Sequence, residues 1–467
     1  MIPYFPKQIS SKGILFYIVC LSIVSLAFSS FAMDAVWIIM GVLEVSLFFV
    51  FSNSLSISWQ RLSSKDFVKK IFFTGLLLRV AWVLFSYFFY LSQVGQPFEF
   101  GAADSLGYHG EAKWLASMNW VEVMQYLFGR GRGVSDTGYV FYLQTIYRIF
   151  GSNVMVARLL KAVYASFTCV LLYRLASRTF NEQCGRMAGI FAMLMPNLII
   201  YCGLHLKETE MLLLIVAFLE RADYTLRSRQ FNFQNIALTL LLAGSLFLFR
   251  TVLGAVAVFA FASGIVFSPE RIINKSRKVV ISVWVALTIF IFAGGTIWTE
   301  VESYWEDRGT NQEVKREQQV ARGNQWAKYA TGTVMAPMVF VLPFSTMVDT
   351  NQQNQMVLHG GNYVRNFMGI FVLIAFFSAL FVKKNWREFS LIGAFVVGYL
   401  GVISMSGFAN AERFLLPGLP CLILFWAYGI SILNAKNYKF VNYWYVVVVV
   451  MEIAWAYFKI GSRGLLG

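Results

Sequence analysis

The feature that most constrains this chain is a long series of apolar runs separated by short polar stretches. Hydrophobic residues make up 58% of the sequence and charged residues only 13%, whereas soluble domains carry about 25% charged residues. A run of about 20 apolar residues, wound as a helix, is long enough to cross the hydrocarbon core of a bilayer. Because backbone groups find no water there, such runs must be helical. The sequence therefore predicts an all-α polytopic membrane protein.

The apolar runs indicate about 11–13 transmembrane helices within a single membrane domain, 1–467. The first run lacks a small-residue cleavage site and is followed at once by a second, so we expect it to remain in the mature protein. The helices of 1–69 precede the apolar run that leads into the first long polar segment, 93–153. Thirteen candidate runs lie at 14–33, 35–53, 70–92, 154–175, 187–203, 209–222, 234–250, 252–268, 279–298, 363–382, 388–405, 413–433 and 440–458.

The net charge of +15 could suggest a nucleic-acid partner, but the basic residues are spread along the chain. They recur between apolar runs, at 61–70, 174–186, 221–229, 271–278, 383–387 and 436–439. This distribution is typical of cytoplasmic loops in membrane proteins, so we expect no nucleic acid to bind. Two long segments, 93–153 and 299–362, then lie on the opposite, extracytoplasmic side. Within the second, Val334–Val348 is short and interrupted by prolines, which favours a re-entrant or interfacial segment.

Asp104 is the most informative single residue, because it follows an apolar helix at the predicted membrane edge and is followed by Tyr108 and His109. A positioned carboxylate can take the proton of an attacking hydroxyl group, which makes Asp104 a candidate general base. Aspartate is also a common N-cap residue. Asp104 could therefore begin a short helix instead, and the two interpretations are compatible.

The tight turn at His205, Lys207 and Glu208 places three titratable groups between two apolar runs. The lysine could bind a lipid phosphate, or it could extend to solvent from an ordinary turn. Arg413, at the start of a later run, could anchor its helix or bind phosphate through its guanidinium fork. Arg250 and Arg365 are candidates of the same type.

Two charges, Glu44 and Arg79, lie well inside apolar runs of nearby N-terminal helices. Charged residues at such depth are costly and are usually paired or functional. Since the two residues are opposite in sign, we expect them to form an ion pair with each other.

Several motifs in this order resemble the GT-C glycosyltransferases that use polyprenyl-phosphate sugars, including protein O-mannosyltransferases and lipid A aminoarabinose transferases. The resemblance covers about 75–225 and 405–430. Its motifs are Asp104-Ser105 with Tyr108-His109, Gly138–Tyr142 through Ile149–Gly151, Ala157–Leu160, Pro196 with Lys207-Glu208, and Arg413–Pro420. The chain differs from the family pattern in having one Asp rather than an acidic pair, two preceding spans, and no large soluble C-terminal domain.

The resemblance implies a GT-C-like bundle and an inverting transferase whose outward cavity lies between the first long loop and the helices. The donor would be a polyprenyl-phosphate-linked sugar, and the acceptor a glycan, lipid or protein, in polysaccharide biosynthesis of the cell envelope at the bacterial inner (plasma) membrane. Asp104 would be the catalytic residue. The resemblance requires no cofactor and leaves a divalent metal open, because metal dependence differs within the superfamily. The predicted substrate-binding residues are Tyr108, His109, His205, Lys207, Glu208, Arg250, His359, Arg365 and Arg413.

Two other functions remain open. A polysaccharide polymerase or ligase would use a polyprenyl-diphosphate glycan donor and would depend more on His359, Arg365 and the 299–362 loop. A lipid or glycan transporter would line a route with charges at mid-span and usually contains internal repeats. The chain has few such charges and no evident repeat.

Overall fold

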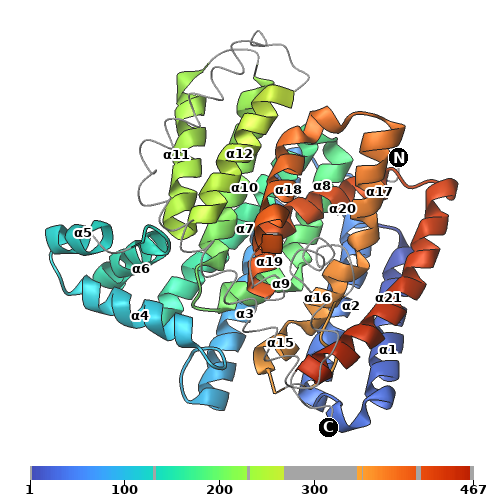
Figure 1. The fold of residues 1–467 in the computed structure, drawn as a ribbon, viewed down its shortest axis with the longest axis horizontal. Coiled ribbons are helices and arrows are strands. Elements are labelled where there is room, and N and C mark those ends of the chain that lie inside the picture. The colour runs from blue at the N-terminus through green and yellow to red at the C-terminus, as the bar shows by residue number, and fades with distance from the viewer. Residues whose placement is uncertain are drawn as a thin grey trace.

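The computed structural model describes residues 3–129, 133–228, 232–267, 344–349, 351–405 and 412–462. Every regular element in these ranges is a helix (Figure 1). Eight of these helices are long and apolar enough to cross a membrane, or nine if a bent pair counts as one span. The protein is an all-α integral membrane protein, as predicted. Helices occur at twelve of the thirteen predicted runs, and the run at 279–298 lies beyond the described ranges.

The N-terminal part consists of α1 (Lys7–Ala27), the short η1 (Ser29–Phe31), α2 (Ala35–Ser58) and α3 (Ser64–Val94). Helix α1 begins and ends several residues before the predicted 14–33. Helix α3 begins where the Ser63 side chain accepts a hydrogen bond from the Asp66 amide, and ends where Gly95 adopts φ 75°. Ser63 is an ordinary start signal, since its side chain satisfies a free amide. Gly95 is an ordinary stop signal, since glycine tolerates the left-handed conformation.

The first long loop folds into three short helices, α4 (Ala103–Ala116), α5 (Trp120–Phe128) and α6 (Thr137–Phe150). Helix α5 starts with a reciprocal capping box between Asn119 and Glu122. The three helices lie together beside one end of α11 (Phe233–Phe249) and α12 (Thr251–Phe267), and α6 contacts α11 (Figure 1). This arrangement holds the Asp104 region against the bundle.

The centre of the bundle is α7 (Val154–Thr179), which packs against α3, α8 (Glu182–Leu194) and α10 (Glu208–Arg227). Helix α8 is followed by α9 (Pro196–Ile200) and η2 (Tyr201–Gly203) after a bend of 54°. Proline at the first position of α9 has no amide hydrogen to donate to the carbonyl of Ala192, four residues earlier. The chain therefore bends there and leaves helix carbonyls without their usual partners.

Arg79 of α3 satisfies these carbonyls. Its buried guanidinium donates to the carbonyl oxygens of Ala192 and Met193 at 3.1 and 3.3 Å. Glu44 of α2 instead accepts a hydrogen bond from the Gly361 amide at 2.7 Å. The predicted ion pair between Glu44 and Arg79 is therefore wrong, because each charge is used to hold backbone groups at a break between helices.

The C-terminal part packs against the bundle, where α16 (His359–Phe367) contacts α2 and α20 (Leu419–Ser431) contacts α8, and its last helix lies beside α1 (Figure 1). Of the predicted re-entrant segment only 344–348 is described, and it is buried and non-helical. Ser345 is bound there by the buried carboxylate of Glu452. The elements are α15 (Gln353–Val357), α16 (His359–Phe367), α17 (Gly369–Phe377), η4 (Ser378–Val382), η5 (Trp386–Phe389), α18 (Ser390–Met405), α19 (Glu412–Leu415), η6 (Leu416–Gly418), α20 (Leu419–Ser431) and α21 (Ala435–Ser462).

Candidate functional site

A cavity of about 300 Å³ lies where the first loop meets the bundle. It is formed by segments far apart in the sequence: the start of α4, the α9–η2 turn, α15 and the start of α19. Its lining residues are Tyr90, Glu99, Gly101, Ala102, Ala103, Asp104, Ile200, Tyr201, Leu204, Leu206, Asn354, Gln355, Val357, Leu358, Glu412 and Arg413. Two predicted site residues, Asp104 and Arg413, therefore share one cavity.

Asp104 and Arg413 form an ion pair across this cavity, although 309 positions separate them. The two side chains are 46% and 38% exposed, and exposed ion pairs contribute only about 0–1 kcal/mol. A charged ligand could therefore replace either partner at low cost. The N-cap of α4 is Ala102, so the N-cap interpretation of Asp104 is wrong. Its carboxylate lies in the first turn, where the helix dipole still favours a negative charge.

Lys207 lies beside this pair and is buried, so the prediction that it extends to solvent from an ordinary turn is wrong. Its Nζ donates to the Phe249 carbonyl at 2.8 Å and forms an ion pair with Asp136. Burial lowers the pKa of Lys207 to about 7, and the nearby positive charges of Arg250 and Arg413 act in the same direction. Lys207 can therefore gain or lose a proton near neutral pH.

Glu208 and Arg250 complete the charged cluster. Arg250 directly follows α11 and stacks over the ring of Phe414, with 4.5 Å between guanidinium carbon and ring centroid. Within the described parts of the chain, its buried Nη1 and the buried Oε2 of Glu208 have no hydrogen-bond partner. Buried polar atoms are nearly always satisfied, so these two atoms are available to a ligand.

Tyr108 belongs to the same electrostatic environment. Its ring packs edge-on against Tyr139 at 5.0 Å between centroids. Burial raises the pKa of Tyr108, and the carboxylates of Glu208 and Asp104 raise it further. The hydroxyl group therefore stays protonated and can donate a hydrogen bond at neutral pH.

His109 and His205 are joined through a tyrosine behind the cavity wall. The Tyr147 hydroxyl lies 2.7 Å from Nδ1 of His109 and 2.9 Å from Nε2 of His205. Burial lowers the pKa of both histidines, and Lys161 lowers that of His205 further. The neutral His-Tyr-His chain, with Lys161 bound to the Leu204 carbonyl at 3.1 Å, fixes the loop that carries Lys207.

Of the predicted site residues, only Asp104 and Arg413 line the cavity. The last two predicted residues, His359 and Arg365, lie in α16. Nε2 of His359 lies 2.7 Å from the Tyr17 hydroxyl, and its Nδ1 lies 2.6 Å from the Met356 carbonyl oxygen. Arg365 is buried and donates to Asn366 at 3.2 Å. Neither residue lines the cavity. Their contacts are those of residues that pack α16 into the bundle.

Two carboxylates that the sequence reasoning missed, Glu99 and Glu412, also line the cavity. Glu99 accepts a hydrogen bond from Ser105. Glu412 accepts one from Asn362, which in turn accepts from Asn197 at 2.9 Å. The position of Glu412 directly before Arg413 was a usable signal, whereas nothing in the local sequence singles out Glu99.

No group of three or more His, Cys, Asp or Glu side chains suited to a metal ion occurs among the residues that the structure describes. The possible divalent metal stays a prediction. Three side-chain cations in this region, Lys207, Arg250 and Arg413, could meet a phosphate.

Comparison with known families identifies part of the chain. Residues 138–298 match the dolichyl-phosphate-mannose-protein mannosyltransferase family. This is a GT-C superfamily domain, so the matched part of this membrane protein is similar to a glycosyltransferase domain, as the resemblance predicted. The match covers about a third of the 467 residues. It includes His205, Lys207, Glu208 and Arg250 but neither Asp104 nor Arg413, whose roles rest on the geometry alone. No curated protein matches the chain.

Proposed function

We propose that this protein is an inverting glycosyltransferase that moves a sugar from a polyprenyl-phosphate donor to an acceptor hydroxyl group on the extracytoplasmic side of the membrane. The observation that carries the proposal is the Asp104–Arg413 ion pair at a cavity beside Lys207 and Arg250. The family match supports this chemistry, because the matched segment includes Lys207, Glu208 and Arg250 of the charged cluster.

In the proposed reaction the donor phosphate binds Arg413, Lys207 and the free Nη1 of Arg250. The guanidinium group of Arg413 then leaves Asp104 and pairs with the phosphate, so the Asp104 carboxylate is free to accept a proton. The acceptor hydroxyl gives its proton to Asp104 while its oxygen forms a bond to the anomeric carbon. The bond from that carbon to the phosphate oxygen breaks, and the phosphate leaves with the electron pair. A single displacement of this kind inverts the anomeric configuration.

The two alternative functions have less support. The polymerase or ligase hypothesis depended on His359, Arg365 and the 299–362 loop. The two side chains are engaged in packing α16, and most of the loop lies outside the described residues. The transporter hypothesis depended on mid-span charges, and Arg79 and Glu44 bind backbone groups instead. The acceptor class, whether glycan, lipid or protein, is left to experiment.

The test is transfer by purified protein supplied with radiolabelled polyprenyl-phosphate sugars and a panel of acceptors. Asp104→Asn should lower kcat by about 10²–10⁴-fold, which is the usual contribution of general-base catalysis. Asp34→Asn is the matched control, because Asp34 is exposed and its side chain makes no capping hydrogen bond. Full activity of Asp104→Asn, or retention of anomeric configuration in the product, would refute the proposal.

A further inference from the structure

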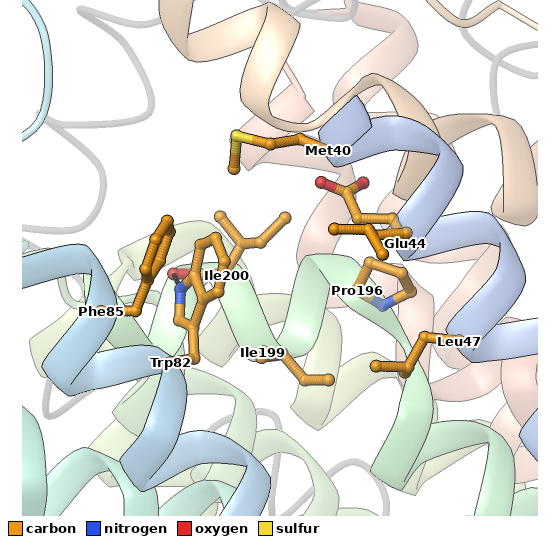
Figure 2. A pocket seen from close by; sticks show the side chains of 9 residues that line it. Met40, Glu44, Leu47, Trp82, Phe85, Pro196, Ile199 and Ile200 are labelled. Atoms are coloured by element: carbon orange, nitrogen blue, oxygen red, sulfur yellow. Dashed lines mark hydrogen bonds between the residues drawn. The ribbon is translucent and has the colours of Figure 1, made fainter. Parts of the chain in front are cut away.

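A second pocket, of about 170 Å³, lies between α2, α3 and α9 and has an almost wholly apolar lining (Figure 2). Figure 2 shows Trp82 and Phe85 of α3 facing Met40 and Glu44 of α2, with α9 between them. Glu44 is the one ionisable group in the lining. We call this pocket the α2–α3 groove, and its lining residues are Met40, Leu43, Glu44, Leu47, Trp82, Phe85, Pro196, Ile199 and Ile200.

The groove exists because the chain breaks at Pro196. The 54° bend there turns α9 away from the line of α8, so α2 and α3 cannot close over it. Two hydrogen bonds then fix its walls. The Trp82 indole donates to the Ile200 carbonyl at 3.2 Å, and the Gly361 amide donates to Glu44 at 2.7 Å. The groove is therefore a preformed feature and needs no ligand to open it.

The groove faces the membrane. Two of its lining side chains, Leu43 and Phe85, are 62% and 48% exposed, and both belong to helices long and apolar enough to span a bilayer. Lipid tails are as apolar as leucine, so a hydrocarbon chain gains by fitting a shaped surface rather than by leaving water. A preformed apolar groove of this kind suits a flexible hydrocarbon chain.

The groove is also next to the polar cavity. Ile200 lines both of them, and the following residue, Tyr201, lines the cavity that contains Asp104 and Arg413. One short helix, α9, therefore separates a hydrocarbon environment from an ion pair that can bind phosphate. A ligand that occupies both places must be an amphiphile with an anionic head and a long apolar tail.

We infer that the α2–α3 groove binds the first isoprene units of the donor's polyprenyl chain while its phosphate lies at Arg413 and Lys207. This inference rests on the proposed function and adds to it a tail site on named helices. Helices α2 and α3 both precede the segment matched to the glycosyltransferase family, 138–298. The N-terminal helices would thus supply part of the donor site.

A kinetic test uses a bulky residue in the groove and a matched one outside it. Leu43→Trp should raise KM for a long-chain polyprenyl-phosphate sugar by roughly tenfold, since displacing two methylene groups costs about that much. KM for a donor that carries a methyl group in place of the prenyl chain should not change, because such a donor has no isoprene unit to place in the groove. Leu77→Trp is the control, because Leu77 is 70% exposed on α3 and lies outside the groove. Equal effects of the two substitutions on the long-chain donor would overturn the inference.

A binding test does not depend on catalysis. Polyprenyl phosphate with a diazirine in its first isoprene units should label α2 and α9 peptides of the full-length protein in nanodiscs. Excess unlabelled polyprenyl phosphate should compete, and Leu43→Trp should reduce the labelling severalfold. Labelling that is competed equally by phospholipid would mean an ordinary bilayer lipid and would overturn the inference. Specific labelling without any sugar transfer would instead reject the proposed reaction and leave the tail site standing.

Discussion

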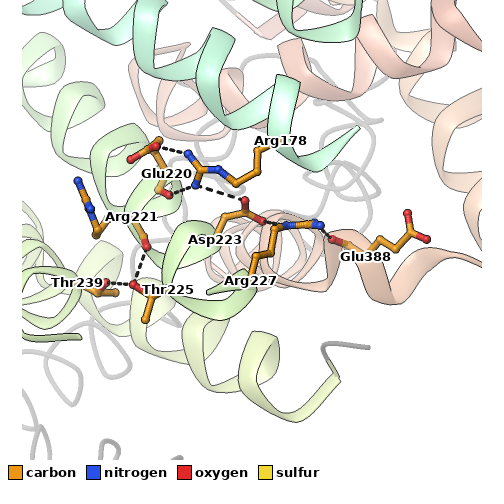
Figure 3. A network of polar contacts seen from close by, with 8 residues as sticks. All are labelled: Arg178, Glu220, Arg221, Asp223, Thr225, Arg227, Thr239 and Glu388. Carbon is orange, nitrogen blue, oxygen red and sulfur yellow. Dashed lines mark hydrogen bonds and ion pairs between the residues drawn. The ribbon is translucent and has the colours of Figure 1, made fainter. Parts of the chain in front are cut away.

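The two ends of α10 both carry clusters of charge, but they differ in how completely those charges are satisfied. At its C-terminal end, Arg178 of α7 forms ion pairs with Glu220 and Asp223, and Arg227 pairs with Asp223 at 2.8 Å (Figure 3). Each arginine also binds a backbone carbonyl, Arg178 that of Glu220 and Arg227 that of Glu388. This cluster connects α7, α10 and η5 as a scaffold.

At the N-terminal end of α10, the charges are incompletely paired. Glu208 and Arg250 each have a buried polar atom without a hydrogen-bond partner in the described ranges. The nearby Asp104–Arg413 pair is more than a third exposed on both sides. Buried polar atoms are costly when left unpaired. Asp223 Oδ2 in the scaffold cluster also lacks a hydrogen bond, but it lies 3.6 Å from Arg178 Nη1. The difference teaches that charges paired with one another mark structure, whereas charged groups with unpaired atoms beside a cavity mark a place for a ligand.

The largest effect is expected from replacing Arg413, the cation that lines the cavity. Arg413→Gln should lower kcat/KM by about 10²-fold, the scale seen when one group that stabilises developing charge is lost, and should leave the thermal unfolding temperature nearly unchanged. Transfer kinetics and a melting curve on the same preparation would check both. A large fall in stability with normal turnover would assign Arg413 to the scaffold instead.

The opposite result is expected in the scaffold cluster. Asp223→Ala removes a buried carboxylate that pairs with the partly exposed guanidinium groups of Arg178 and Arg227, and it should destabilise the protein by about 1–3 kcal/mol. Activity per folded molecule should stay within about twofold, because the substitution lies at the far end of α10 from the cavity and such distant sites usually act independently. Thermal unfolding in detergent and single-concentration transfer assays would measure the two effects. Lost turnover at full stability would contradict the comparison.

The pH dependence of transfer should sharpen the assignment of Lys207. Its pKa of about 7 means that it is protonated below that pH and loses its positive charge above it. If the ammonium form binds the phosphate, kcat/KM should fall about tenfold per pH unit above the pKa, as for any single ionisation. Arginine stays charged, so kcat/KM of Lys207→Arg should remain constant up to a higher pH. A profile identical to that of the unsubstituted protein would remove Lys207 from phosphate binding.

The smallest expected effect belongs to Glu412, which lines the cavity and is held by Asn362. Glu412→Gln should lower kcat/KM by roughly 3–10-fold, the equivalent of one net hydrogen bond. Asn362→Ala, which frees the carboxylate without removing it, should have a similar effect, and the double variant should be no worse than either alone. Additive losses would show that the two residues act separately.

Much of the fold could be predicted from local sequence. Long apolar runs must form helices in a bilayer, so twelve of the predicted runs are helices of about the expected extent. The proximity of Asp104 to Lys207 and Arg413 was predicted only through a resemblance of ordered motifs, because no local pattern encodes contacts across 309 positions. Arg365 has the same residue type as the cavity residue Arg413, and the sequence could not show that its hydrogen bond goes to Asn366 within the bundle.

The sequence by itself determined that this chain is a membrane-embedded helical protein, since every apolar run in hydrocarbon must pair its backbone groups within a helix. The break at Pro196 was not predicted, because the sequence predicts 187–203 as one apolar run, and it was found in the structure. Only the tertiary structure decided which charges serve the scaffold and which face the cavity. Arg79 and Arg413 are both arginines on helices of the membrane domain. Arg79 binds the carbonyl oxygens of Ala192 and Met193, whereas Arg413 binds Asp104. The physical reason is that the role of a charge depends on which partners surround it, and packing between distant helices sets those partners.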